Sequence, residues 1–197
     1  MNIDFRPYLY RSFDHAADIV TGIQPAQLTN RTPCQEFDVD TLIAHVVGNG
    51  HRLVALGRGE NPYGMDYPRV DLNVAPSELR RTRMEAEEVW TDDAKLEGVA
   101  SRLAGVTFTG DVVVAMYFFE LVAHAWDLAV STGQVERLDQ ELARPALDAA
   151  KATLPPEGRD MVAPGIPFGV EITVSADAPA WEQLAAYLGR DPHPALQ

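Results

Sequence analysis

The stretch YFFELVAHAWDLAV, residues 117–130, decides how the rest of the chain is interpreted. It is apolar along most of its length, yet it contains Glu120, His124 and Asp127 at spacings of four and three residues. On an α-helix, these spacings place all three polar side chains on one face. Burying a carboxylate and an imidazole among apolar side chains is costly unless each group finds a partner. The stretch therefore predicts a buried helix with a polar face that needs a partner.

Two explanations account for this polar face. Glu120 and His124 can ligate one metal ion, because carboxylate oxygen and imidazole nitrogen are both good donors to zinc. The same pair can instead form a salt bridge or contain a satisfied core histidine, which is the commoner outcome for such a pair taken alone. A catalytic zinc site usually has three protein ligands and an open position. The metal interpretation therefore needs a third ligand from elsewhere in the chain.

Composition indicates an ordinary globular protein. The 197 residues are 46% hydrophobic and 23% charged, which suits a single domain over residues 1–197. The formal charge of −13 repels phosphate backbones and anionic membrane surfaces, so neither nucleic acid nor membrane is an expected partner. No window approaches the roughly 18 apolar residues of a membrane span, and the N-terminus lacks the apolar core of a signal peptide. Cys34, the single cysteine, fits a reducing compartment, so we expect a cytoplasmic protein, monomeric or homodimeric.

Hydrophobic periodicity predicts four long helices. Apolar residues recur at three- and four-residue intervals in segments 5–21, 38–54, 76–90 and 111–132, as is typical of helices with a buried face. We expect these four helices to form one bundle, with the candidate site where facing helices meet.

The remaining segments are less regular. The sequence of residues 57–73 predicts a long loop, and loops of this length often cover a site. Residues 94–109 fit either a helix or a short strand. A shorter helix is expected at 139–154, where two prolines end it. The segment 157–179 is rich in proline and extended, with a possible edge strand in FGVEITV, and residues 180–188 predict a last short helix.

Of the five histidines, His45 and His124 lie in strongly apolar helical stretches. The sequence GNG at 48–50 follows His45. Gly and Asn weaken a helix interior by up to about 1 kcal/mol relative to Ala, so the triplet indicates a helix that lies close to something or ends early. His15 lies off the apolar stripe of its helix and is expected at the solvated surface. His51 is six residues from His45 and is expected to point elsewhere.

Three strings, TPCQEFDVDTLIAHVVGNG at 32–50, ELVAHAWDLAVSTG at 120–133 and LAAYLGRDP at 184–192, resemble the actinobacterial relatives of the mycothiol-dependent maleylpyruvate isomerase. These relatives are part of the wider DinB-type metal-binding proteins. The resemblance covers nearly the whole chain. It implies an all-α fold, a DinB-like four-helix bundle with a short extra helix and a largely extended C-terminal segment that packs on the bundle from about residue 155.

The resemblance also implies a metal site. The family has one His in the second helix and a Glu or His four residues before a His in the later long helix, and these positions fall on His45, Glu120 and His124. The implied ion is divalent, with zinc expected. The roles of two other residues have two alternatives each. Cys34 is either a fourth, redox-sensitive ligand or a small buried hydrophobe. Asp127 either accepts the N–H of a ligating imidazole, or caps or pairs with an arginine elsewhere in the core.

The function implied by this resemblance is thiol chemistry. Zinc holds a thiol deprotonated at neutral pH and so can present it as a nucleophile without a separate base. The thiol of the resembled isomerase is mycothiol, which implies a mycothiol-dependent S-transferase or isomerase acting on a small electrophile. That isomerase has a further C-terminal domain at its active site, whereas only residues 151–197 could contribute here, so thiol transfer or an unassigned reaction is favoured over maleylpyruvate isomerisation. The alternative is a non-catalytic metal-bearing module that binds a small molecule or senses redox state.

Overall fold

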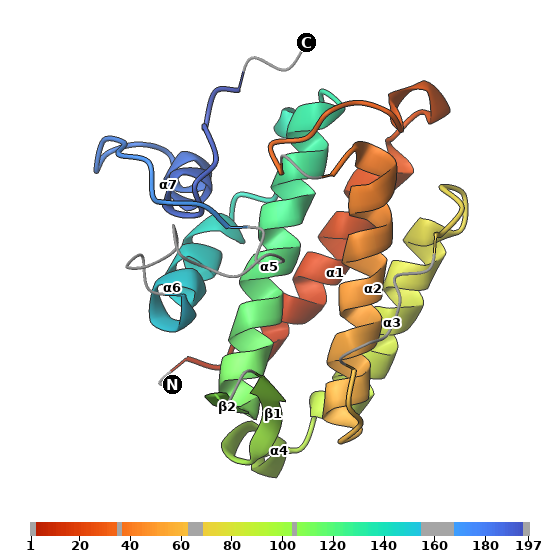
Figure 1. The fold of residues 1–197 in the computed structure, drawn as a ribbon, viewed down its shortest axis with the longest axis vertical. Coiled ribbons are helices and arrows are strands. Elements are labelled where there is room, and N and C mark those ends of the chain that lie inside the picture. Colours follow the sequence, from red (N-terminus) through yellow and green to blue (C-terminus); the bar gives the residue numbers. More distant parts are fainter. Residues whose placement is uncertain (1–2, 35–36, 63–68, 104–105, 155–167, 195–197) are drawn as a thin grey trace.

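Four helices form a bundle in the computed structural model (Figure 1), which describes residues 3–34, 37–62, 69–103, 106–154 and 168–194. The four are α1 (Arg6–Thr21), α2 (Val39–Gly57), α3 (Ala75–Trp90) and α5 (Gly110–Ser131). Both α1 and α2 pack against α3 and against α5, so α1 lies diagonally opposite α2. The mainly helical fold and the expected bundle are confirmed.

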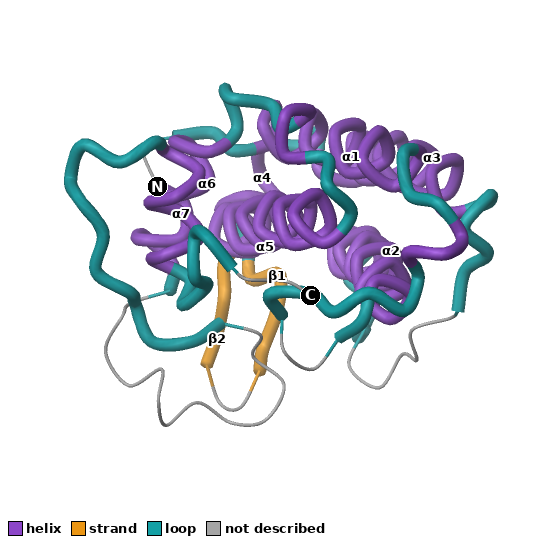
Figure 2. Tube along the Cα trace, turned by 90° about the horizontal axis from the view of Figure 1, so that it is seen from above, coloured by secondary structure: helices purple, strands orange, loops and turns teal. Residues whose placement is uncertain are grey.

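Helix α5 is the centre of the molecule. It packs against α1 and α2 on one side and against α6 (Ala143–Thr153) on the other, as Figure 2 shows from above. A helix covered on most sides is apolar all round. By length and composition α5 is in fact apolar enough to cross a membrane, so the expectation that no window approaches that length is wrong. In this fold 78% of the apolar window is buried inside the protein, as in the core helix of a globular domain.

The C-terminal part of the chain lies beside α5. Helix α7 (Ala180–Tyr187) packs against α6 and α5. The edge strand expected in FGVEITV, residues 168–174, does not form. Instead, the N–H groups of Gly169 and Ile172 donate to the carbonyls of Leu188 (3.1 Å) and Ala186 (2.9 Å) at the end of α7. Carbonyl groups at the end of α7 thus accept the hydrogen bonds that a neighbouring strand would accept in a sheet. The segment is extended but is not part of a sheet. Residues 155–167 lie outside the described part.

Residues 94–109, for which the sequence fitted either a helix or a short strand, contain both. A short helix, α4 (Asp93–Glu97), precedes an antiparallel hairpin of β1 (Val99–Leu103) and β2 (Val106–Thr109). In this register Ser101 pairs with Phe108. The hairpin leads directly into α5. The predicted loop at 57–73 is described only in part, because residues 63–68 lie outside the described ranges.

Helix α2 continues through the GNG triplet to Gly57. Asp38 caps its start, since its carboxylate accepts from the backbone N–H of Thr41 at 2.8 Å. A Cβ at Gly50 would lie 2.8 Å from Cγ2 of Thr82 on α3 and 2.9 Å from the ring of Phe13 on α1. Of the two explanations for the triplet, close approach is therefore the one realised. Gly50 therefore lets α2 pack closely against both α1 and α3.

Candidate metal centre

His45, Glu120 and His124, called the triad below, come together where α2 meets α5. One ligand atom from each residue lies within 4.8 Å of the others. His45 Nε2 is 3.3 Å from Glu120 Oε1, and His124 Nε2 is 3.9 Å from the same oxygen. The two imidazole rings meet edge to face, with centroids 4.9 Å apart. The described residues therefore offer a cluster of two nitrogens and one oxygen that could hold one ion.

The triad is buried on two sides and more open on the third. His45 is 7% exposed and His124 0%, whereas the Glu120 side chain is 21% exposed. The rings of Phe37 and Phe168 lie 5.0 Å from His45 and 6.0 Å from His124, measured between centroids. These rings shield the two imidazoles from water. Glu120 is therefore the member of the triad most accessible to solvent.

The protonation states of Glu120 and His124 suit the binding of a cation. Burial raises the pKa of Glu120, but its hydrogen bond with His45, the charge that the two imidazoles can hold, and the N–H of Asn49 together bring it below its usual range. Burial lowers the pKa of His124, and the hydrogen bond with Asp127 opposes this only in part. An ionised carboxylate and a neutral imidazole are the forms in which these groups bind a metal.

Asp127 orients the imidazole of His124. Its Oδ2 is 3.0 Å from His124 Nδ1, so Nδ1 carries the proton and the lone pair falls on Nε2. Nε2 is buried and has no hydrogen-bond partner within the described part of the chain. A buried nitrogen lone pair facing a carboxylate oxygen is what a metal ligand requires.

Arg190 completes this arrangement. Its Nε donates to Asp127 Oδ1 at 3.3 Å and its Nη2 donates to Oδ2 at 3.1 Å. Burial raises the pKa of Asp127, but the charge of Arg190 and the contact with His124 outweigh it and lower the pKa. Asp127 thus fulfils both of the expected alternatives, since it accepts an imidazole N–H and pairs with an arginine.

The position of Arg190 depends on two glycines. Gly189 has a φ of 78°, and a Cβ there would lie 2.6 Å from the backbone of Gly169. This close approach brings Arg190 over the ring of Phe168, with Cζ 4.8 Å from the centroid. Hydrophobic periodicity could not identify Arg190 as part of the site. The only signal was its place in the string LAAYLGRDP.

Cys34 belongs to a second cluster. Its sulfur lies within 4.8 Å of a ligand nitrogen of His124 and an oxygen of Asp127. Both Asp127 oxygens already accept hydrogen bonds from Arg190, and a guanidinium at this position repels a second cation. Among the described residues, the two clusters share only His124. The triad is therefore the better candidate for an ion, with Cys34 beside it.

Two other histidines lie away from the triad. The expectation that His15 is at the surface is wrong, because it is 8% exposed and its ring lies 6.4 Å from that of Trp181. Trp181 is on α7, so a side chain from near the end of the chain lies beside this part of α1. The periodicity of α1 alone contains no information about this contact. His51 points elsewhere as predicted, with its Nε2 2.7 Å from Oε1 of Glu78 on α3.

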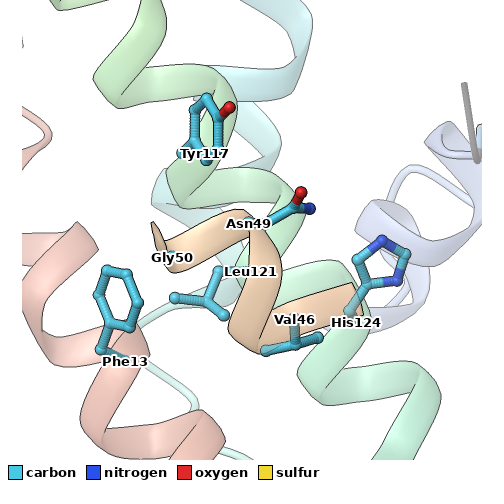
Figure 3. Close-up of a pocket in the computed structure, with 7 residues that line it drawn as sticks. All are labelled: Phe13, Val46, Asn49, Gly50, Tyr117, Leu121 and His124. Atoms are coloured by element: carbon cyan, nitrogen blue, oxygen red, sulfur yellow. The ribbon is translucent and has the colours of Figure 1, made fainter. Parts of the chain in front are cut away.

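A cavity of about 10 Å³ lies beside the triad, enough for about one water molecule. Its lining residues are Phe13, Val46, Asn49, Gly50, Tyr117, Leu121 and His124. Figure 3 shows Asn49 reaching out from α2 toward the side on which His124 lies. Any molecule larger than water requires some of these side chains to move.

Comparison with known proteins gives matches over most of the chain. A family model described as the mycothiol maleylpyruvate isomerase N-terminal domain matches residues 9–129, a span that contains the triad. Two uncharacterized proteins from two strains of Mycobacterium tuberculosis are each 33% identical over 180 residues, which is 91% of this chain and 94% of theirs. No solved structure matches the chain.

Proposed function

The chain belongs to the mycothiol maleylpyruvate isomerase N-terminal domain family, and from this premise we propose that it is a metal-dependent enzyme of small-thiol chemistry. The triad would hold one divalent ion, with zinc expected. The reaction would be transfer of a mycothiol-type thiol to a small electrophile, or thiol-assisted isomerisation of it. The observation that supports this most strongly is the buried, unbonded Nε2 of His124, which lies 3.9 Å from the Glu120 carboxylate.

The donor set of the triad suits zinc. Two imidazoles and one carboxylate are a known ligand combination of catalytic zinc sites, which leave a further position open. The set carries one negative charge, so a divalent ion would retain one positive charge and attract an anionic fourth ligand. When bound, zinc would lower the pKa of a thiol at that position and so supply a nucleophile at neutral pH.

The protein's own residues orient and shield the site. Asp127, held by Arg190, fixes the tautomer and the ring orientation of His124 and raises its basicity. Phe37 and Phe168 keep water from the imidazoles, which strengthens electrostatic interactions there. The more exposed Glu120 lies on the side from which a thiol and an electrophile would approach.

A non-catalytic role is the second candidate, and the position of Cys34 favours it. A protein thiol within 4.8 Å of a nitrogen of His124 could, after moving toward His45 and Glu120, complete a four-coordinate site, which is typical of structural zinc. Such a site would bind a small molecule or respond to oxidants without turnover.

Cobalt substitution separates the two functions. If the enzyme proposal is right, adding mycothiol to the cobalt-loaded protein should produce a sulfur-to-cobalt absorption band in the near ultraviolet. The band should follow thiol ionisation at a pH well below the roughly 8.5 of a free thiol. A band that exists before thiol is added and disappears in Cys34→Ser would support the closed site. If cobalt binds but no thiol produces a band, the thiol chemistry is refuted.

A further inference from the structure

The side-chain amide of Asn49 bridges two of the triad's ligand atoms. Its Nδ2 is 2.8 Å from Glu120 Oε1 and 3.0 Å from His45 Nε2. An ionised carboxylate only accepts hydrogen bonds, so the amide end that faces Glu120 is the NH₂ group. In the tautomer that can ligate an ion, with the lone pair on Nε2, His45 accepts the second N–H of this amide.

This bridge competes with a metal ion. A neutral imidazole has a single acceptor nitrogen with one lone pair, so His45 Nε2 cannot accept the Asn49 N–H and ligate an ion at the same time. The carboxylate oxygen of Glu120 is shared in the same way. An ion ligated by the whole triad therefore requires the Asn49 amide to turn away.

The displaced amide would remain next to the ion. Asn49 lies one helical turn after His45 on α2, and it lines the small cavity beside His124 (Figure 3). Tyr117, which lies one turn before Glu120 on α5, lines the same cavity. Because this space holds about one water molecule, any larger group could enter it only if one of these side chains moved.

We propose that Asn49 is a gate residue of the triad. Its amide weakens metal binding by occupying two ligand atoms. An ion held by the whole triad would have to displace this amide from both atoms. The inference rests on the proposed function for the presence of the ion, but it concerns a residue outside the triad and is tested by metal affinity rather than by activity.

The test is the zinc dissociation constant, measured by competition with a chromophoric chelator. Removing the competing amide in Asn49→Ala or Asn49→Ser should tighten zinc binding by roughly 3- to 10-fold, about the net strength of one hydrogen bond. Asn30→Ala is the matched control, since the Asn30 amide also makes a part-buried hydrogen bond, to the Ser131 carbonyl at 2.9 Å, but away from the triad. Its zinc affinity should equal that of the wild type.

A second measurement uses the wild-type protein and does not depend on the folding of a variant. The side-chain amide resonances of Asn49 should shift when zinc is added, because the bonds to Glu120 and His45 break. Unchanged resonances, or Asn49 variants that bind zinc no more tightly than the wild type, would overturn the proposal; weaker binding would identify Asn49 as a ligand instead. If the wild type and Asn30→Ala bind no zinc at all, the proposed function fails, and the gate fails with it.

Discussion

His124 and His15 are both buried, and each has an Nε2 without a hydrogen-bond partner among the described residues. Their surroundings differ. His124 has Asp127 at Nδ1 and the Glu120 carboxylate 3.9 Å from Nε2, whereas the neighbour identified for His15 is the ring of Trp181. Burial and an unbonded nitrogen therefore do not define a ligand. Convergence of further donor atoms on the same nitrogen distinguishes the candidate site from a histidine that only fills space.

The sharpest test of this comparison removes each histidine. His124→Ala should lose zinc almost completely, because it deletes a ligand, and the loss should exceed the about 10- to 100-fold typical of removing a partner behind a ligand. His15→Ala should retain the wild-type affinity. The measurement is elemental analysis after dialysis. Full zinc occupancy in His124→Ala would remove the basis for separating the two histidines.

The second test concerns the Asp127–Arg190 pair that orients His124. His15 has no such pair among the described residues. In Arg190→Met the buried Asp127 carboxylate loses its cation, which should lower the free energy of unfolding by about 3–5 kcal/mol and zinc affinity by about 10- to 100-fold.

Urea denaturation measures this loss. The control is Arg144→Met, because Arg144 makes an exposed contact with Gln183 at 3.3 Å, and such a change should cost less than about 0.5 kcal/mol. Adding Asp127→Asn to Arg190→Met should recover part of the lost stability, since no buried charge then remains unpaired. Equal stability of Arg190→Met and the wild type would contradict the role of this pair.

The third test uses pH and concerns His15. Burial lowers the pKa of His15 from its ordinary 6.5, while nearby charges both raise and lower it. Those charges belong to Asp139, Asp18, Arg137 and Arg11. Above pH 6.5 the histidine is neutral in both states, and its contribution to stability is complete. As the pH falls below 6.5, the unfolded chain binds the proton first, so stability should decrease by at most about 1.4 kcal/mol per pH unit.

The variant His15→Leu should remove this part of the pH dependence. The measurement is the free energy of unfolding in urea on both sides of pH 6.5. His51→Gln is the control, because His51 is only partly buried and bonds to Glu78. If the wild type and His15→Leu lose stability in parallel on acidification, His15 is not the buried, neutral group that its position indicates.

The bundle was predictable because each of its helices buries a face, and that requirement is visible in periodicity. The same reasoning placed Glu120 and His124 on one face of a buried helix. It put His45 in an apolar helix but could not bring it to α5, and only the family resemblance paired the three residues.

The remaining features depend on contacts between distant segments. Arg190 reaches Asp127 from 63 residues away, and Trp181 covers His15 from the far end of the chain. No local pattern encodes either contact. The alternation of FGVEITV is the same whether a strand or a helix end accepts its N–H groups, so the pattern could not exclude a strand. The bridging position of Asn49 likewise depends on how closely α2 approaches α5.

The contact between Arg190 and Asp127 links the site to the order of synthesis. At about 5–20 residues per second, a ribosome needs seconds to add the 63 residues that separate the two. During that interval the nascent α5 holds Asp127 without its cation, and His124 has no firmly held partner. We therefore expect a newly made chain to bind the ion about 10- to 100-fold more weakly until Arg190, which follows the last helix, has been translated and docked.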